Sequence, residues 1–90
     1  MTRRTFIKNV RDTRRMVAKG CLDSATSFRV LNTLFDIDRL PGADALAAVN
    51  KARAAMDDPS NRFGETSKAV LVKKLDRLAK NLETGGIEEV

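Results

Sequence analysis

Seven basic side chains lie within the first nineteen residues, and no other feature of the sequence points as directly to binding chemistry. They are Arg3, Arg4, Lys8, Arg11, Arg14, Arg15 and Lys19. Asp12 is the one acid of this stretch, which carries +6, whereas the rest of the chain holds ten bases and eleven acids. The planar guanidinium of arginine pairs with phosphate or carboxylate through two parallel hydrogen bonds. The sequence therefore predicts a surface for an anionic partner.

The composition contains few of the residue types that usually carry out catalysis. The 90 residues include no His, no Trp, no Tyr and a single Cys, so the usual proton carriers, zinc ligands and activated nucleophiles are scarce. We interpret Cys21 as a small apolar residue. Two acidic clusters, at 36–44 and 57–61, do not have the spacing of a calcium loop and are better explained as helix caps and turns. We expect a protein without catalytic residues, cofactor or metal site, and so no enzyme.

The elements that position the basic residues are predicted to be helices. Turn and helix-stop residues at Gly20, Pro41–Gly42, 57–61 and Gly85–Gly86 separate four segments of helical length, none with the alternation of a half-buried strand. The fold class predicted is all-α, a compact bundle of about four short helices. Residues 1–84 form one domain, and 85–90 form an acidic, loosely ordered tail. Short connections indicate antiparallel neighbours.

The first predicted helix, at about 5–19, has two opposite faces. The apolar face holds Phe6, Val10, Thr13 and Val17 at helical spacing. On the other side, a sector of roughly 80° holds five bases about one turn apart. These five are Arg4, Lys8, Arg11, Arg15 and Lys19, with Arg3 and Arg14 expected to support them. We expect the five cations to form an exposed row that binds phosphates or carboxylates.

The other three segments differ in their apolar patterns. The second is predicted to run from Asp23 or Ser24 to Leu40 and, being apolar on more than one side, to be central. The third begins at Asp44, and its many alanines indicate close approach to a neighbour. The fourth is capped by Thr66 or Ser67 and carries a leucine row, which is either a core face or the seam of a homodimer. The row consists of Leu71, Leu75, Leu78 and Leu82.

A further motif spans residues 17–32, where a turn precedes Ala25-Thr26 and the run Arg29-Val30-Leu31-Asn32. This stretch resembles the helix-turn-helix of lactose-repressor-type regulators, whose recognition helix enters the major groove. The resemblance implies that Ser24, Thr26 and Ser27 face the bases. The turn is one residue shorter than in that family, and Phe28 falls where a polar contact belongs.

Two functions remain open from the sequence. The first is a small nucleic-acid-binding or nucleoprotein-associated factor that contacts the phosphate backbone. We expect no aromatic platform for stacking nucleobases, because packing or loops explain all four Phe residues. The alternative is a protein-binding module with an acidic partner, of the kind that viruses and mobile elements encode as inhibitors or assembly factors.

The segment 2–8 resembles a twin-arginine export motif, but no apolar run follows it. We expect no membrane association and a cytoplasmic location.

Overall fold

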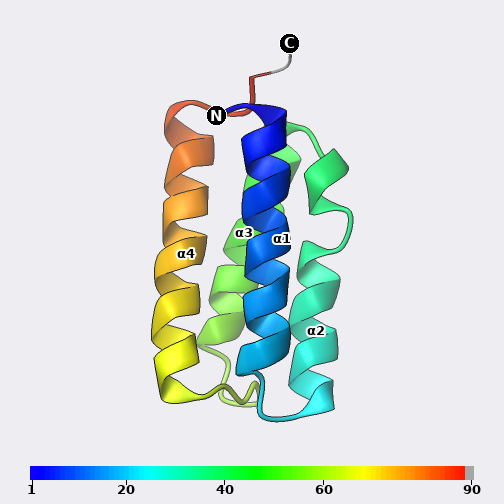
Figure 1. Ribbon diagram of the computed structural model, residues 1–90, viewed down its shortest axis with the longest axis vertical. Helices are drawn as coiled ribbons and strands as arrows, with labels where there is room; N and C mark the ends of the chain where they lie inside the picture. Colours follow the sequence, from blue (N-terminus) through cyan, green and yellow to red (C-terminus); the bar gives the residue numbers. More distant parts are fainter. Residues whose placement is uncertain (89–90) are drawn as a thin grey trace.

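The computed structural model describes residues 1–88 and contains four α-helices, joined by short connections. These are α1 (Arg3–Gly20), α2 (Ser24–Leu34), α3 (Gly42–Met56) and α4 (Glu65–Thr84), with a 3-10 turn η1 (Ile37–Arg39) before α3. Successive helices run in opposite directions along the long axis (Figure 1). Each packs on its neighbours in a closed ring, with α1 between α2 and α4. The predicted all-α bundle of four helices is confirmed.

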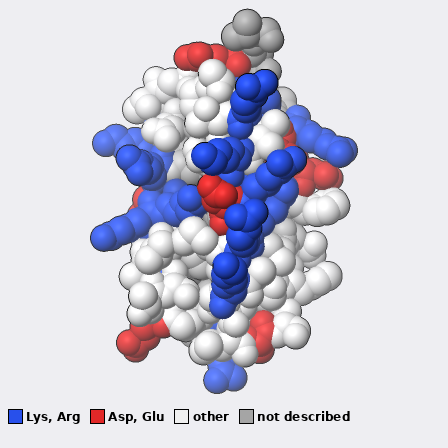
Figure 2. Space-filling model, viewed as in Figure 1, with Lys and Arg blue, Asp and Glu red and all other residues white. Residues whose placement is uncertain are grey.

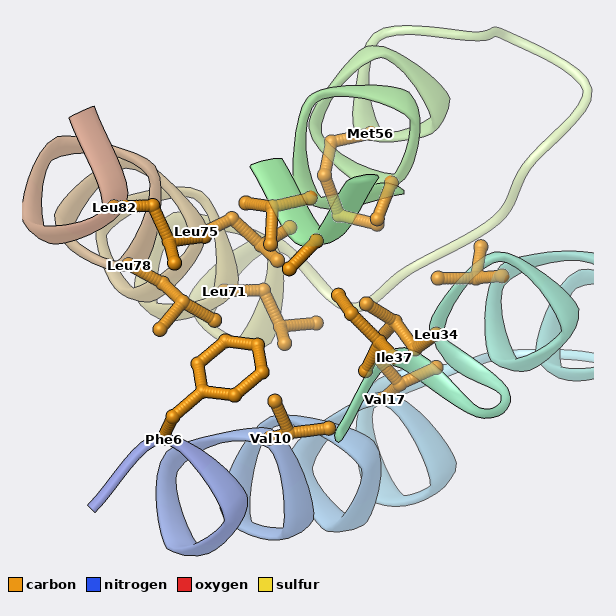
Figure 3. Packing of buried hydrophobic residues seen from close by; sticks show 14 residues of the cluster. Phe6, Val10, Val17, Leu34, Ile37, Met56, Leu71, Leu75, Leu78 and Leu82 are labelled. Atoms are coloured by element: carbon orange, nitrogen blue, oxygen red, sulfur yellow. The ribbon is translucent and has the colours of Figure 1, made fainter. Parts of the chain in front are cut away.

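The core is built from one face of each helix, as helical periodicity requires. Phe6, Val10, Thr13 and Val17 of α1 are fully buried, which confirms the apolar face predicted for this helix. They meet the leucines of α4 and the side chain of Ile37 in the centre of the bundle (Figure 3). The buried hydroxyl of Thr13 is satisfied within its own helix, where it donates to the carbonyl of Asn9 at 2.7 Å.

The leucine row of α4 belongs to this core. Leu71 and Leu75 are fully buried, Leu78 is 2% exposed and Leu82 is 7% exposed. Their side chains point toward α1 and the centre of the bundle (Figure 3). In the folded chain these side chains are therefore committed to the interior, and a homodimer seam through them would require the bundle to open.

The second helix departs from the prediction in length and in position. α2 ends at Leu34, and Asp36 then adopts a left-handed conformation with φ of 61° before η1 begins. Its buried side consists of Thr26, Val30 and Leu34, whereas Phe28 is 68% exposed and Phe35 is 71% exposed. The expectation of a central helix covered on several sides was wrong, because a helix in a four-membered ring buries one face only.

Two helix starts also differ from the predicted ones. α3 begins at Gly42, behind Pro41, rather than at Asp44. α4 is preceded by Gly64 rather than capped by Thr66 or Ser67. The amide of Gly64 donates to the carbonyl of Gly20 at 3.0 Å, so this connection is fixed against the end of α1. At that point α1 and α4 approach so closely that a Cβ added to Gly20 would lie 2.7 Å from the Cβ of Ser67.

The two ends of the described chain lie at the same end of the bundle (Figure 1). The amino group of Met1 donates to the carbonyl of Gly86 at 3.1 Å, and the amide of Glu88 donates to the carbonyl of Met1 at 2.7 Å. Part of the predicted loose tail is thus hydrogen-bonded, and its last two residues lie outside the described part. No helix in the described part is long and apolar enough to cross a membrane.

Candidate nucleic-acid interface

The basic row lies on the outward side of α1, opposite the core. We use this name for Arg4, Lys8, Arg11, Arg15 and Lys19, all of which are exposed. They form a line of basic side chains along α1 down the middle of the molecular surface (Figure 2). Within residues 1–88, none of them forms an ion pair or donates a hydrogen bond. From Arg4 to Lys19 the row extends over about 22 Å at the helical rise of 1.5 Å per residue.

Arg14 belongs to the packing of the bundle rather than to the row. Its Nε and Nη2 donate to the carbonyl of Leu34 at 3.1 and 2.6 Å, and Nη2 lies 3.4 Å from Oδ1 of Asp38. The last helical turn of α2 presents carbonyls without helical partners, and the guanidinium satisfies one of them. Arg14 therefore joins α1 to the end of α2, and its hydrogen-bonding capacity is largely used inside the protein.

Arg3 has a similar position at the other end of α1. Its Nη1 donates to the carbonyls of Asp38 and Leu40 at 3.1 and 2.9 Å, and its guanidinium carbon lies 5.8 Å from the centre of the Phe6 ring. This side chain holds η1 and the segment after it against α1. Arg3 and Arg14 thus have structural contacts within the bundle, and their supporting role in partner binding stays a prediction.

A shallow hollow of about 530 Å³ runs along the outer side of α1 and contains most of the row. Its lining residues are Arg3, Arg4, Ile7, Lys8, Arg11, Asp12 and Arg15. Five basic groups around one open hollow, four of them from the row, favour an extended anion over a small neutral ligand, because each can contact a separate charge. Asp12 is the one acid within α1 and does not change the sign of this surface.

Sequence reasoning missed a second group of bases, on α4. Lys73, Lys74 and Arg77 line a hollow of about 310 Å³ between α1 and α4, whose floor includes Met16 and Val70. Basic side chains extend from the row over α4 in the surface view (Figure 2). Lys73, Lys74 and Arg77 lie on one side of α4, opposite the side that faces α3, and this helical spacing could have indicated them from the sequence. Only the packing of α4 beside α1 shows that they border the basic row.

The structure separates the three residues that the helix-turn-helix resemblance implied, since Ser24 and Ser27 reach the surface and Thr26 does not. Thr26 is fully buried, and its Oγ1 accepts a hydrogen bond from the amide of Arg62 at 2.9 Å. Ser24 is exposed and Ser27 is half-buried. The helices of that motif cross at about 90–120°, whereas α1 and α2 run antiparallel side by side (Figure 1). The implied placement of Thr26 against bases was wrong, because this residue anchors α2 to the loop before α4.

Local electrostatics at the start of α2 are those of a helix cap. The carboxylate of Asp23 accepts a hydrogen bond from the amide of Thr26 at 2.7 Å, and this bond lowers the pKa of the Asp23 carboxyl. Burial raises the pKa of the neighbouring Cys21 thiol, as for a residue that packs rather than reacts. In the described part of the chain, no three His, Cys, Asp or Glu side chains lie close enough together to hold a metal ion.

A second surface missed by sequence reasoning is an apolar one on α2. We call Phe28, Leu31 and Phe35 the α2 stripe; together with Ser24, Ser27 and Asn32 they line a shallow hollow of about 340 Å³. Large exposed aromatic side chains are uncommon on monomeric proteins, and contiguous ones mark interaction sites. The 3.6-residue period was visible in the sequence, but it did not indicate which of the two apolar sides of this segment faces solvent.

Comparisons of the chain with protein-family models, with curated proteins and with solved structures found no match.

Proposed function

We propose that this protein is a small nucleic-acid-binding factor without catalytic activity, and that α1 binds the phosphate backbone through the basic row. The observation that carries the proposal is that five cations on one face of α1 project into solvent with no partner among residues 1–88. A solvated helix face normally mixes charges of both signs, whereas α1 contains a single acid. This proposal retains the cytoplasmic location predicted from the sequence.

Five exposed cations predict a definite dependence of binding on salt. If each neutralises one phosphate, the slope of log K against log salt is about −4.5 on a duplex and about −3.5 on a single strand. The affinity for a duplex would then fall by about 500-fold between 50 and 200 mM salt. The basic side chains of α4 (Lys73, Lys74 and Arg77) would make the slope steeper if the nucleic acid also contacts them.

The test is charge reversal at the middle of the row. The double variant Arg11→Glu/Arg15→Glu should lose most of its binding to labelled oligonucleotides in fluorescence anisotropy, and its salt slope should fall by about two units. The fold should persist by circular dichroism, because both side chains are exposed. The matched control is Lys51→Glu/Lys68→Glu, which changes net charge equally at exposed positions of α3 and α4 outside the row.

Equal losses in the two double variants would reduce the effect to net charge and refute a specific role for the row. No binding by the native protein at 50 mM salt would refute the nucleic-acid function itself.

The second candidate, docking on an acidic protein, is favoured by the exposed α2 stripe, since apolar surface beside a charged row is common at protein interfaces. It predicts that the same Arg11 and Arg15 variants lose an acidic protein partner instead.

A further inference from the structure

The α2 stripe presents two aromatic side chains to solvent, one within α2 and one at its C-terminal cap. Phe28 and Phe35 are seven residues apart, and Phe35 directly follows the last residue of α2. They are 68% and 71% exposed, and Leu31 lies between them in the hollow that all three line. The opposite side of α2 is fully used by the core. The two rings therefore contribute little to the stability of the bundle and are accessible to a partner.

The stripe lies on the helix that packs beside the helix carrying the basic row. The carbonyl of Leu34, the residue before Phe35, accepts both hydrogen bonds from Arg14. Arg14 in turn is flanked on α1 by Arg11, one turn earlier, and by Arg15. The cations of α1 and the rings of α2 therefore occupy neighbouring helices that run side by side (Figure 1).

The charge around the stripe selects among its occupants. A second copy of this chain would bring another basic row beside the first, and the net charge of +5 on each copy opposes that contact. A nucleic-acid duplex offers phosphates to α1 but keeps its base faces stacked inside. A single strand offers both phosphates and free base faces, and aromatic side chains beside a basic groove are the usual elements of single-strand binding.

We infer that the α2 stripe is a base-stacking platform, so that the nucleic acid held by the basic row is single-stranded, with Phe28 and Phe35 against the bases. This inference rests on the proposed function and adds the class of nucleic acid to it. It also departs from the expectation from sequence that packing or loops explain all four Phe residues. Stacking is tolerant of sequence, so binding should show little base selectivity.

The first experiment compares one labelled oligonucleotide as a single strand and as a duplex. The variant Phe28→Ala/Phe35→Ala should weaken single-strand binding by at least about 30-fold and leave duplex binding and the salt slope unchanged. Because both rings are exposed, its melting temperature should match that of the native protein. Leu22→Ala, an exposed apolar residue outside the stripe, should change neither affinity.

A second variant separates stacking from general apolar contact. Phe28→Leu/Phe35→Leu keeps apolar side chains but removes the aromatic faces, so the loss of single-strand affinity should persist. Restored affinity in this variant would refute stacking. In addition, the chain contains no Trp and no Tyr, so Phe28→Trp provides a single indole. Its fluorescence should be quenched by a single strand and remain unchanged with a duplex.

The failures of the two proposals have different signatures. If Arg11→Glu/Arg15→Glu abolishes binding while Phe28→Ala/Phe35→Ala binds single strands as the native protein does, the nucleic-acid function stands and the stacking platform is refuted. If the native protein binds neither form at 50 mM salt, the proposed function fails and the inference fails with it. The stripe would then be a contact surface for an acidic protein.

Discussion

The close approach of α1 and α4 at Gly20 predicts the effect of adding one methyl group. In Gly20→Ala the new Cβ would lie 2.7 Å from the Cβ and 3.2 Å from the Oγ of Ser67, with Cδ1 of Leu71 at 3.8 Å. Overpacking of this kind costs about 1–3 kcal/mol. Alanine regains about 0.5–1 kcal/mol over glycine in a helix. The net loss is therefore about 1 kcal/mol, which lowers the melting temperature by about 4–8 °C.

The assay is thermal unfolding followed by circular dichroism, with two comparisons. Gly42 is the first residue of α3, and no atom lies within 4 Å of a Cβ added there. Gly42→Ala should therefore stabilise the protein by about 0.4–1 kcal/mol. In a Ser67→Gly background the obstructing Cβ is gone, and Gly20→Ala should become neutral or stabilising. In a Ser67→Ala background the Cβ remains, and the loss should persist. A loss of equal size in the Ser67→Gly background would refute the steric argument.

The remaining predictions concern the start of α2. Thr26→Val keeps the shape of a fully buried side chain but removes the acceptor of the Arg62 amide, so the free energy of unfolding should fall by about 1–3 kcal/mol in urea titrations, and an unchanged midpoint would contradict this. The lowered pKa of Asp23 means that its contribution to stability is present above about pH 4 and disappears as pH falls through the lowered pKa. Asp23→Asn retains a capping acceptor without the titration, so its melting temperature should fall less than that of the native protein between pH 7 and pH 2; parallel pH profiles would rule out this role.

The sequence was most informative where two patterns agreed on one helix. On α1 the buried face and the basic row are 180° apart in the periodicity, and the structure has Phe6, Val10 and Val17 inside and Arg11 and Arg15 outside. Each pattern alone would define a helix face, and together they determine its orientation. The leucine row of α4 was equally clear as an apolar face, but its choice between core and dimer seam required the packing of α1 against it.

The second helix shows what periodicity cannot supply. Its sequence has one apolar line through Val30 and Leu34 and another through Phe28 and Phe35, and aromatic residues usually outrank valine in burial energy. The structure buries the first line because Thr26, on the same side, accepts a hydrogen bond from a loop 36 residues away. The left-handed Asp36 then ends the continuous helix that the apolar run to Leu40 had suggested. Both determinants are long-range or conformational, and neither leaves a local pattern in the sequence.

The roles of Arg3 and Arg14 were hidden for the same reason. Both count as cations in the sequence, but each uses its guanidinium to satisfy carbonyls of the segment 34–40, which is distant along the chain. Their charge was predictable, whereas their partners depended on where α2 stops. For the candidate site, the five residues of the basic row were predictable from periodicity, and the bordering bases of α4 and the α2 stripe were not.

The seven basic residues of α1 fall into two groups, those hydrogen-bonded within the bundle and those exposed, and this difference has an evolutionary consequence. Arg3 and Arg14 hydrogen-bond to the segment 34–40, so their replacement is constrained by folding, whereas the five residues of the basic row are exposed and folding constrains them little. Drift at these five positions would alter the pattern of charge displayed at a spacing of one helical turn while the core beneath it persists. Under the proposed function, such a helix is a recognition surface whose preferred polyanion can change through single substitutions that leave the folded core intact.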